Sequence, residues 1–227
     1  MAIQEGDFIR LHFTGYANGI LFDTTEEQKA REAGVYEEGR DYTPKVVCVG
    51  KRQIILGLDE AIIGKEPGFE ETIIVPPEKA FGDHEQELLR SYEKKSFKKK
   101  PEKGMVVNIP EAGRGTVVNI IGNRVIVDFN HPLAGQTLTY TYRIEGIVES
   151  ATEKIAGLIK LFSGYDMDVS LEGSTALIQL PPGIYYVSNT WFNMKPYIMK
   201  SIFDQVPGIE EVRFIETYKN TKNKSEE

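Results

Sequence analysis

The sequence predicts an α+β fold in which antiparallel sheets dominate and helices are few. Short extended runs of apolar and polar residues lie at 7–13, 20–23, 45–50, 69–75 and 137–148. Only two short helices are expected between them, at 26–33 and near 59–63, and sustained helical periodicity begins only after residue 150. The chain has 227 residues, of which 41% are hydrophobic and 27% charged, so it can form one large globular domain or two to three small ones.

The N-terminal region begins with a predicted β-hairpin. Residues 7–13 alternate as a strand, and an extended run at 20–23 follows a turn that contains Asn18-Gly19. The polar segment that follows predicts a short helix at 26–33, and a strand returns at 45–50. These elements indicate a sheet with an excursion at its edge.

The stretch 49–84 is the most informative part of the chain. An apolar turn at 53–58 opens the short helix, and Gly64 stands where a glycine commonly ends a helix. A strand at 69–75 then stops at two prolines, and an exposed Phe81-Gly82 pair follows. We expect these pieces to line a small apolar pocket. Such a pocket suits binding or conformational work better than bond cleavage.

A small β domain is expected between the two halves of the first sheet. A lysine-rich run leads into short strands at 105–109, 115–121 and 124–129. The alternating strand at 137–148 needs the earlier sheet as its partner, so 84–130 is interpreted as an insertion. Its apolar residues exceed what so small a core can bury, and they either form a surface for unfolded segments or pack on the main domain. The surface candidates are Ile109, Val117, Ile120, Ile121 and Ile126.

The C-terminal region predicts a two-layer α/β sandwich of the order α-β-β-α-β. Apolar residues at helical spacing mark helices near 155–162 and 191–203, with strands at 166–171, 176–180 and 212–217. A preceding strand would complete a split β-α-β arrangement. The apolar residues Tyr185, Tyr186, Trp191 and Phe192 form either a homodimer face or the core, and residues 220–227 are expected to be a disordered tail.

Several classes of function are disfavoured by composition and by the motifs present. The net charge of −7 argues against nucleic-acid binding, and the lysine run is interpreted as a solvated surface. The single cysteine, Cys48, is expected to be a buried apolar residue, and the three histidines lack metal-ligand spacing. No signal peptide, membrane span or cofactor motif is recognised, so no metal, cofactor or membrane partner is expected and a cytoplasmic location is predicted.

Five segments, in order along the chain, resemble the FKBP-type peptidyl-prolyl cis–trans isomerases. They are GDFIRLHFTGY (6–16), LFDT (21–24), VGKRQIILGLDEAIIG (49–64), ETIIVPPEKAFGDH (71–84) and NHPLAGQTLTYTYRI (130–144). The resemblance implies an FKBP-like sheet wrapped on the short helix, formed by 1–83 and 131–149. The insert 84–130 is similar to the insert-in-flap chaperone domain of SlyD-like members. The region 150–219 is similar to the extra domain of long archaeal members.

The resemblance also implies a set of prolyl-site residues. Taken singly, the apolar members would be core residues, and only the joint motif favours a site. Leu58 stands where many members have a tryptophan, and Phe81 stands where many have a tyrosine whose hydroxyl bonds the substrate. Asp23 lies at the edge of the site and could instead cap the following helix. The implied site residues are Tyr16, Phe22, Asp23, Ile54, Ile55, Leu58, Phe81, Leu133 and Tyr140.

The predicted function is prolyl isomerisation by desolvation in an apolar pocket, without a nucleophile, a metal or another cofactor. The insert would bind unfolded or partly folded, proline-containing chains, and the resemblance adds a macrolide as a further ligand of the site. The alternative is an FKBP-like module that binds or chaperones its partners without catalysis.

Overall fold

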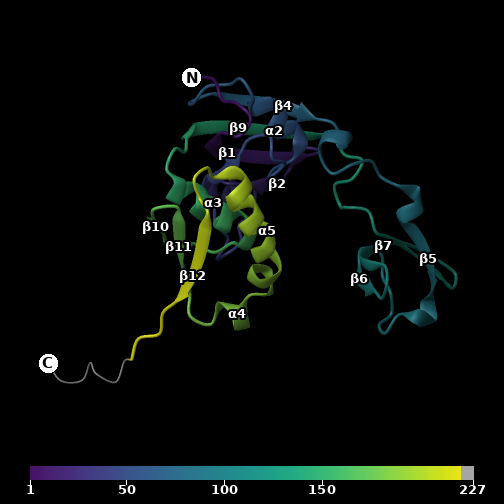
Figure 1. The fold of residues 1–227 in the computed structure, drawn as a ribbon. Helices are drawn as coiled ribbons and strands as arrows, with labels where there is room; N and C mark the ends of the chain where they lie inside the picture. The colour runs from purple at the N-terminus through teal and green to yellow at the C-terminus, as the bar shows by residue number, and fades with distance from the viewer. Residues whose placement is uncertain (221–227) are drawn as a thin grey trace. The chain divides into compact units, whose positions relative to one another are not determined.

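The computed structural model describes residues 1–220, except for the side chain of Val187. It confirms the α+β class (Figure 1). By compactness the chain divides into two units. Among the described residues, the first contains 1–16, 21–73 and 140–220, and the second contains 17–20 and 74–139. The tail expected at 220–227 lies outside the described residues, apart from residue 220.

The largest sheet has five strands in the order β2-β1-β9-β4, with β3 paired to β1. β1 and β3 are antiparallel, with Phe8 opposite Cys48. The short helix α2 lies against this sheet, because the Tyr142 hydroxyl of β9 donates to the Ala61 carbonyl at 3.2 Å. The elements are β1 (Phe8–Ala17), β2 (Ile20–Thr24), α1 (Glu27–Glu32), β3 (Lys45–Cys48), α2 (Leu56–Ile62), β4 (Glu70–Val75) and β9 (Leu138–Ile147).

The insert is an antiparallel sheet of four strands in the order β5-β8-β7-β6. Its core consists of Val107, Val117, Val125 and Val127, which alternate along their strands onto one face. The sequence missed β5, because only two of its five residues, Leu89 and Tyr92, are apolar. The elements are 3₁₀ turns (Pro77–Lys79, Gln86–Leu88 and Lys94–Ser96), β5 (Leu89–Glu93), β6 (Val106–Ile109), β7 (Gly113–Ile121) and β8 (Arg124–Asp128).

The five predicted surface residues of the insert differ in their exposure to solvent. Val117 is fully buried, so its assignment to the surface is wrong: it alternates with the buried Gly115 and pairs with the core residue Val127. Ile109, Ile120 and Ile126 are half-buried, whereas Ile121 is 62% exposed.

The C-terminal region forms a three-stranded sheet in the order β10-β11-β12, covered by helices. β11 and β12 are adjacent and parallel, so the expected split β-α-β arrangement is wrong. The strand that precedes this region, β9, is instead paired within the five-stranded sheet. The elements are α3 (Ala151–Ser163), β10 (Val169–Glu172), β11 (Thr175–Leu180), α4 (Ile184–Val187), α5 (Asn189–Gln205) and β12 (Glu211–Glu216).

One hydrophobic core joins the C-terminal region to the five-stranded sheet. Phe8 of β1, Cys48 of β3 and Val148 after β9 pack with Ile155 and Leu158 of α3. Helix α3 therefore packs against β3 on one side and α5 on the other. The close approach requires a glycine in α3, because a Cβ at Gly157 would lie 2.5 Å from the side chain of Val46. The C-terminal region covers apolar side chains of the first sheet as well as its own.

Candidate functional site

Aromatic rings from three strands converge where the sequence predicts the prolyl site. The rings of Phe22 and Tyr140 meet edge to face with centroids 5.7 Å apart, and Phe13 lies 6.0 Å from Tyr140. Gly15 makes this pairing possible, since a Cβ there would lie 2.8 Å from both rings. Tyr140 is buried, whereas Phe22 is half-buried and keeps part of its ring accessible.

The Tyr140 hydroxyl stays protonated at ordinary pH. Burial of the ring, and secondarily the negative charge of Asp23, raise its pKa well above the usual value. Tyr140 therefore offers this part of the molecule an apolar ring with a neutral hydroxyl rather than a base.

Asp23, at the end of β2, is ion-paired with Arg40. Arg40 belongs to a polar segment in which Tyr36 and Tyr42 stack at 5.5 Å and Arg31 lies 3.5 Å above the Tyr36 ring. These contacts give the predicted excursion a defined structure. Asp23 does not cap helix α1, since the N-cap residue is Glu26 and its amide donates to the Thr24 hydroxyl at 3.1 Å. The capping interpretation of Asp23 is therefore wrong.

The loop before α2 is held by the carboxylate of Asp59. Asp59 is buried and accepts backbone hydrogen bonds from Gly50 at 2.9 Å and Arg52 at 3.0 Å. Arg52 itself has a left-handed backbone with φ +53°, a conformation that costs energy for a residue other than glycine. The Asp59 carboxylate compensates this cost and fixes the turn that leads into Ile54 and Ile55.

Three of the expected residues follow directly from that turn. Leu58 is buried in α2, whereas Ile54 and Ile55 are half-buried at its entrance. The Ile55 carbonyl accepts from the amides of Leu58 and Asp59 at the start of the helix. Within residues 1–220, the Ile55 amide itself donates to no protein acceptor. It is thus available to an external carbonyl.

Gln53 connects this loop to the C-terminal region. Its side-chain oxygen accepts from the Cys48 amide at 2.7 Å, and its side-chain amide donates to Gln205 of α5 at 2.8 Å. The residue directly before Ile54 is therefore anchored to β3 and to a helix 152 positions further along the chain.

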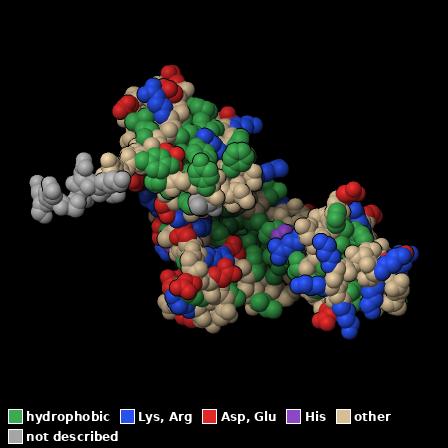
Figure 2. All heavy atoms as spheres, turned by 90° about the horizontal axis from the view of Figure 1, so that it is seen from below, with side chains coloured by type: hydrophobic (Ala, Val, Ile, Leu, Met, Phe, Trp, Pro, Cys, Tyr) green, Lys and Arg blue, Asp and Glu red, His purple; other side chains and the backbone are tan. Residues whose placement is uncertain are grey.

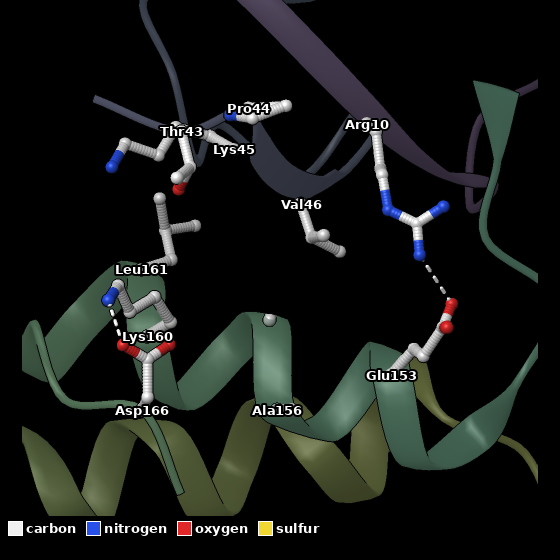
Figure 3. Close-up of a pocket in the computed structure, with 11 residues that line it drawn as sticks. Arg10, Thr43, Pro44, Lys45, Val46, Glu153, Ala156, Lys160, Leu161 and Asp166 are labelled. Carbon is white, nitrogen blue, oxygen red and sulfur yellow. Dashed lines mark hydrogen bonds and ion pairs between the residues drawn. The ribbon is translucent and has the colours of Figure 1, made fainter. Parts of the chain in front are cut away.

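A second connection runs from α3 to the segment that carries Arg40. Lys160 of α3 pairs with Asp166 (Figure 3). Lys160 also lies 3.5 Å from Asp41, which pairs with Lys45. Burial alone would raise the pKa of Asp41, but bonds from Thr43 and Lys45 and the charge of Lys160 hold it below its ordinary value. Lys160 and Asp166 line one end of a cavity of about 220 Å³ between β3 and α3. Arg10 and Glu153, which pair at 2.8 Å, line its other end.

The remaining predicted residues are divided between the two units. Tyr16, in the first unit, is half-buried at the end of β1. Phe81 and Leu133 are half-buried in the second unit, where the Phe81 ring stacks on His131 with centroids 4.0 Å apart. The structure thus brings Phe22, Asp23 and Tyr140 together, and it fixes Ile54, Ile55 and Leu58 around one turn.

Sequence reasoning missed several residues that position this site. Asp59 carried a usable signal, because an acid in the first turn of a short helix is placed to bind amides nearby. Gly15 carried no distinct signal, because it lay in the segment predicted as a turn, where glycine is common. Arg40 and Gln205 carried no sequence signal, because their partners are distant and solvent-facing polar segments have no periodicity.

Metal and membrane features can be stated for residues 1–220. No group of three or more His, Cys, Asp and Glu side chains there is arranged to hold a metal ion. None of the helices in this range combines the length and the hydropathy required to span a bilayer.

Three family models match successive parts of the chain. The model described as FKBP-type peptidyl-prolyl cis-trans isomerase matches residues 1–103. The models described as FKBP26, IF domain and FKBP26_C-terminal match 91–133 and 151–219.

Curated relatives show the same similarity. The short-type peptidyl-prolyl cis-trans isomerase of Methanocaldococcus jannaschii is 30% identical over 154 residues, which are 66% of this chain and 98% of the relative. The SlyD isomerase of Helicobacter pylori is 32% identical over 137 residues, or 57% of this chain and 74% of the relative. The FKBP-type 16 kDa isomerase of Escherichia coli K12 is 26% identical over 149 residues, or 63% of this chain and 92% of the relative.

These similarities agree with the geometry of the site, in which aromatic rings converge and the turn before α2 is anchored. The chain belongs to the FKBP-type peptidyl-prolyl cis–trans isomerases. Its three-part organisation is that of the members with an insert and a C-terminal region, as the two FKBP26 models indicate.

Proposed function

We propose that the site accelerates isomerisation of X–Pro bonds by desolvation rather than by acid–base chemistry. An X–Pro amide rotates across a barrier of roughly 18–20 kcal/mol. The twisted amide has less charge separation than the planar one, so an apolar environment favours it. Lowering the barrier by roughly 4–7 kcal/mol corresponds to an acceleration of about 10³–10⁵.

The observations that carry this proposal are the aromatic pair over Gly15 and the turn fixed by Asp59. In this proposal Phe22, Tyr140 and Leu58 supply apolar surface for the prolyl ring, together with Ile54. The available Ile55 amide donates to the carbonyl on the ring side. Tyr16, Phe81 and Leu133 complete the proposed site on the strength of the family resemblance.

Asp23 has an electrostatic role in this proposal. Its charge is partly compensated by Arg40, and it contributes to raising the pKa of Tyr140, so that this hydroxyl stays neutral. The carboxylate therefore acts on the dipole of the rotating carbonyl or orders Tyr16. It does not act as a general base, because no proton is transferred in the reaction.

We further propose a division of labour along the chain. Residues 1–83 and 131–149 carry the isomerase site, 84–130 bind unfolded clients, and 150–219 support the isomerase. Apolar side chains left exposed on the insert support client binding: Val106 is 49% exposed and Ile121 is 62% exposed. Holding a client on the same molecule raises its effective concentration at the site.

The decisive experiment replaces residues 84–130 with a short Gly-Ser loop. Isomerisation of a tetrapeptide should stay within about twofold of the parent, whereas catalysed refolding of a proline-limited protein should fall by at least about tenfold. Val106→Ser and Ile121→Ser in the full chain provide a milder test of the same surface. Refolding activity that is unchanged in the loop variant would contradict the proposal.

A non-catalytic binding module is the alternative function. The feature that favours it is Phe81, since the family's usual tyrosine hydroxyl is missing there. A tetrapeptide assay separates the two directly: no rate above the uncatalysed one would support the binding module. A Phe81→Tyr variant then measures the effect of the hydroxyl.

We also infer further partners and a source for the chain. The similarity to an archaeal relative, together with the FKBP26 architecture, supports an archaeal origin and a cytoplasmic location. The apolar site is proposed to accept a macrolide, which a competition assay against tetrapeptide turnover tests.

A homodimer through the C-terminal region is proposed from its exposed aromatic side chains. Tyr186 is 91% exposed and Phe192 is 67% exposed, and Phe203 lies three helical turns after Phe192 on α5. Light scattering of the full chain should give twice the monomer mass, and Phe192→Ser with Phe203→Ser should give the monomer. A parent chain that is monomeric at micromolar concentration would contradict the dimer.

A further inference from the structure

The insert carries a groove along its edge strand β6. One wall is β6 itself, and the other is the segment from Ser96 to Lys99. The groove has a volume of about 430 Å³. Within residues 1–220, strand β6 pairs with β7 and with no other strand. The backbone N–H and C=O groups on its outer edge therefore have no partner strand, and this edge lies on the side of the groove.

The floor of the groove is apolar and rigidly supported. Phe97, Met105 and Ile109 are half-buried and pack against the valine core of the insert. Val106 is 49% exposed beside them. An extended chain can therefore add to the edge of β6 and place alternate apolar side chains against this floor.

The rim of the groove is basic and unneutralised. Lys98 and Lys99 line the groove, and Lys100 and Lys103 come shortly after them in the sequence. None of these four lysines forms an ion pair with any residue of 1–220. Residues 84–130 contain nine Lys and Arg against six Asp and Glu, a net charge of +3, whereas the whole chain carries −7. Figure 2 shows Lys and Arg side chains gathered on the insert.

We propose that this groove binds extended client segments in which Asp or Glu flanks apolar side chains. The inference rests on the proposed client binding by the insert and adds a charge preference to it. The apolar floor alone would accept segments of any charge. Because successive strand residues are about 3.3 Å apart, an acidic residue next to an anchored side chain lies within a Debye length of Lys98 and Lys99. The same lysines repel basic segments, which gives selectivity by exclusion.

Charge selection also has a physical use in this molecule. Outside the insert the chain is strongly acidic, so an acidic client is repelled by most of the surface and attracted only by the groove. The basic rim thus directs such a segment to one place and leaves the rest of the surface unoccupied.

The test uses the full chain and three labelled peptides with one apolar core. The flanking residues are Asp in the first peptide, Gln in the second and Lys in the third. Fluorescence anisotropy should show the Asp peptide binding at least about tenfold more tightly than the Lys peptide at low ionic strength. That ratio should fall to about twofold near 1 M salt, where the Debye length is about 3 Å.

Variants assign the preference to the rim. Lys98→Gln with Lys99→Gln should remove most of the preference, and Lys98→Glu with Lys99→Glu should reverse it toward the Lys peptide. Val106→Ser should weaken the binding of all three peptides by the same factor, because it changes only the apolar floor of the groove. Lys200→Gln with Lys219→Gln removes two exposed lysines of the C-terminal region and should leave every affinity unchanged.

The possible results separate this inference from the proposal on which it rests. Equal affinity for the three peptides would overturn the charge preference while leaving client binding intact. Failure of the parent chain to bind any of them would overturn client binding itself. A single-stranded oligonucleotide serves as a competitor for the bound Asp peptide. If it displaces that peptide at a lower concentration than the unlabelled peptide does, the lysines bind nucleic acid and the inference is overturned.

Discussion

At Gly15 the backbone of β1 passes so close to two aromatic rings that no side chain fits. Gly15→Ala would place a Cβ 2.8 Å from both Phe22 and Tyr140, and the edge-to-face pair would have to separate. We expect a loss of about 1–3 kcal/mol in the free energy of unfolding. We also expect a tetrapeptide kcat/KM at least about tenfold lower, since tenfold corresponds to only 1.36 kcal/mol of barrier.

Gly146→Ala is the matched control for Gly15→Ala. Gly146 lies in β9 of the same sheet, and a Cβ there would meet nothing within 4 Å. Denaturant unfolding and tetrapeptide turnover should therefore change little in this variant. If Gly15→Ala were as active as Gly146→Ala, the aromatic pair would not be part of the site.

Cys48 should behave as a reporter of unfolding rather than as a reactive thiol. Burial raises its pKa to about 11, and the thiolate is the form that reacts with alkylating agents. At pH 8 we expect iodoacetamide to label native protein far more slowly than free cysteine. In urea the labelled fraction should follow the circular-dichroism transition. Rapid labelling of the native chain would mean that β3 opens independently of the rest.

At the residue scale, the sequence identified side chains better than it identified their partners. Phe22 and Tyr140 were assigned to the site from motifs, and the structure brings them together. Arg40 and Asp59 were missed, because an ion pair or a buried acceptor depends on where the backbone turns. The motif that marks Asp23 says nothing about the cation 17 positions away.

Among the elements, α3 is connected to the region of Asp23 by an ion pair. Its Lys160 reaches Asp41, which is adjacent to the Arg40 that pairs with Asp23. We expect Lys160→Gln to loosen this segment and to lower tetrapeptide kcat/KM about two- to fivefold, a loss of roughly 0.5–1 kcal/mol. Lys160→Arg should restore most of the activity, because it keeps the charge.

A purely structural effect of Lys160 would show a different pattern. The activity loss in Lys160→Gln should exceed what its change in stability explains, and high salt should reduce the difference from the parent. Lys200→Gln on the exposed face of α5 serves as the control. Equal activity of Lys160→Gln and the parent at low salt would show that α3 does not influence the site.

Element prediction succeeded where one face is buried. Helices α3 and α5 and the strands of the five-stranded sheet were located from periodicity, because a packed face forces apolar residues to recur at 3.6 or 2 positions. Strand β5 was missed because it is an edge strand with polar residues at three of its five positions. Val117 was assigned to the surface because the insert has more apolar residues than its core can bury, and that excess does not show which of them face inward.

For the whole molecule, the shared core predicts that the C-terminal region cannot be removed without damage. Truncation after residue 149 would expose Phe8, Cys48 and Val148, which now pack against α3. Each large apolar side chain so exposed loses roughly 1.5–3 kcal/mol of burial energy. We expect the truncated chain to unfold several degrees lower and to aggregate on heating.

Differential scanning calorimetry checks this expectation, with light scattering to follow aggregation. Phe8→Ser and Val46→Ser in the truncated chain should reduce aggregation by making the exposed face polar. A truncated chain with the Tm and solubility of the parent would show that the five-stranded sheet does not depend on the C-terminal region.

The sequence by itself determined the α+β class, the family and the residue types of the prolyl site. These follow from alternation, helical spacing and short motifs, which are local properties of the chain. Only the tertiary structure decided that Asp23 pairs with Arg40, that Asp59 holds the turn before Ile54, and that α3 completes the core under Phe8. Such pairings depend on which distant segments pack together, and packing is selected by the fit of whole surfaces rather than by any local pattern.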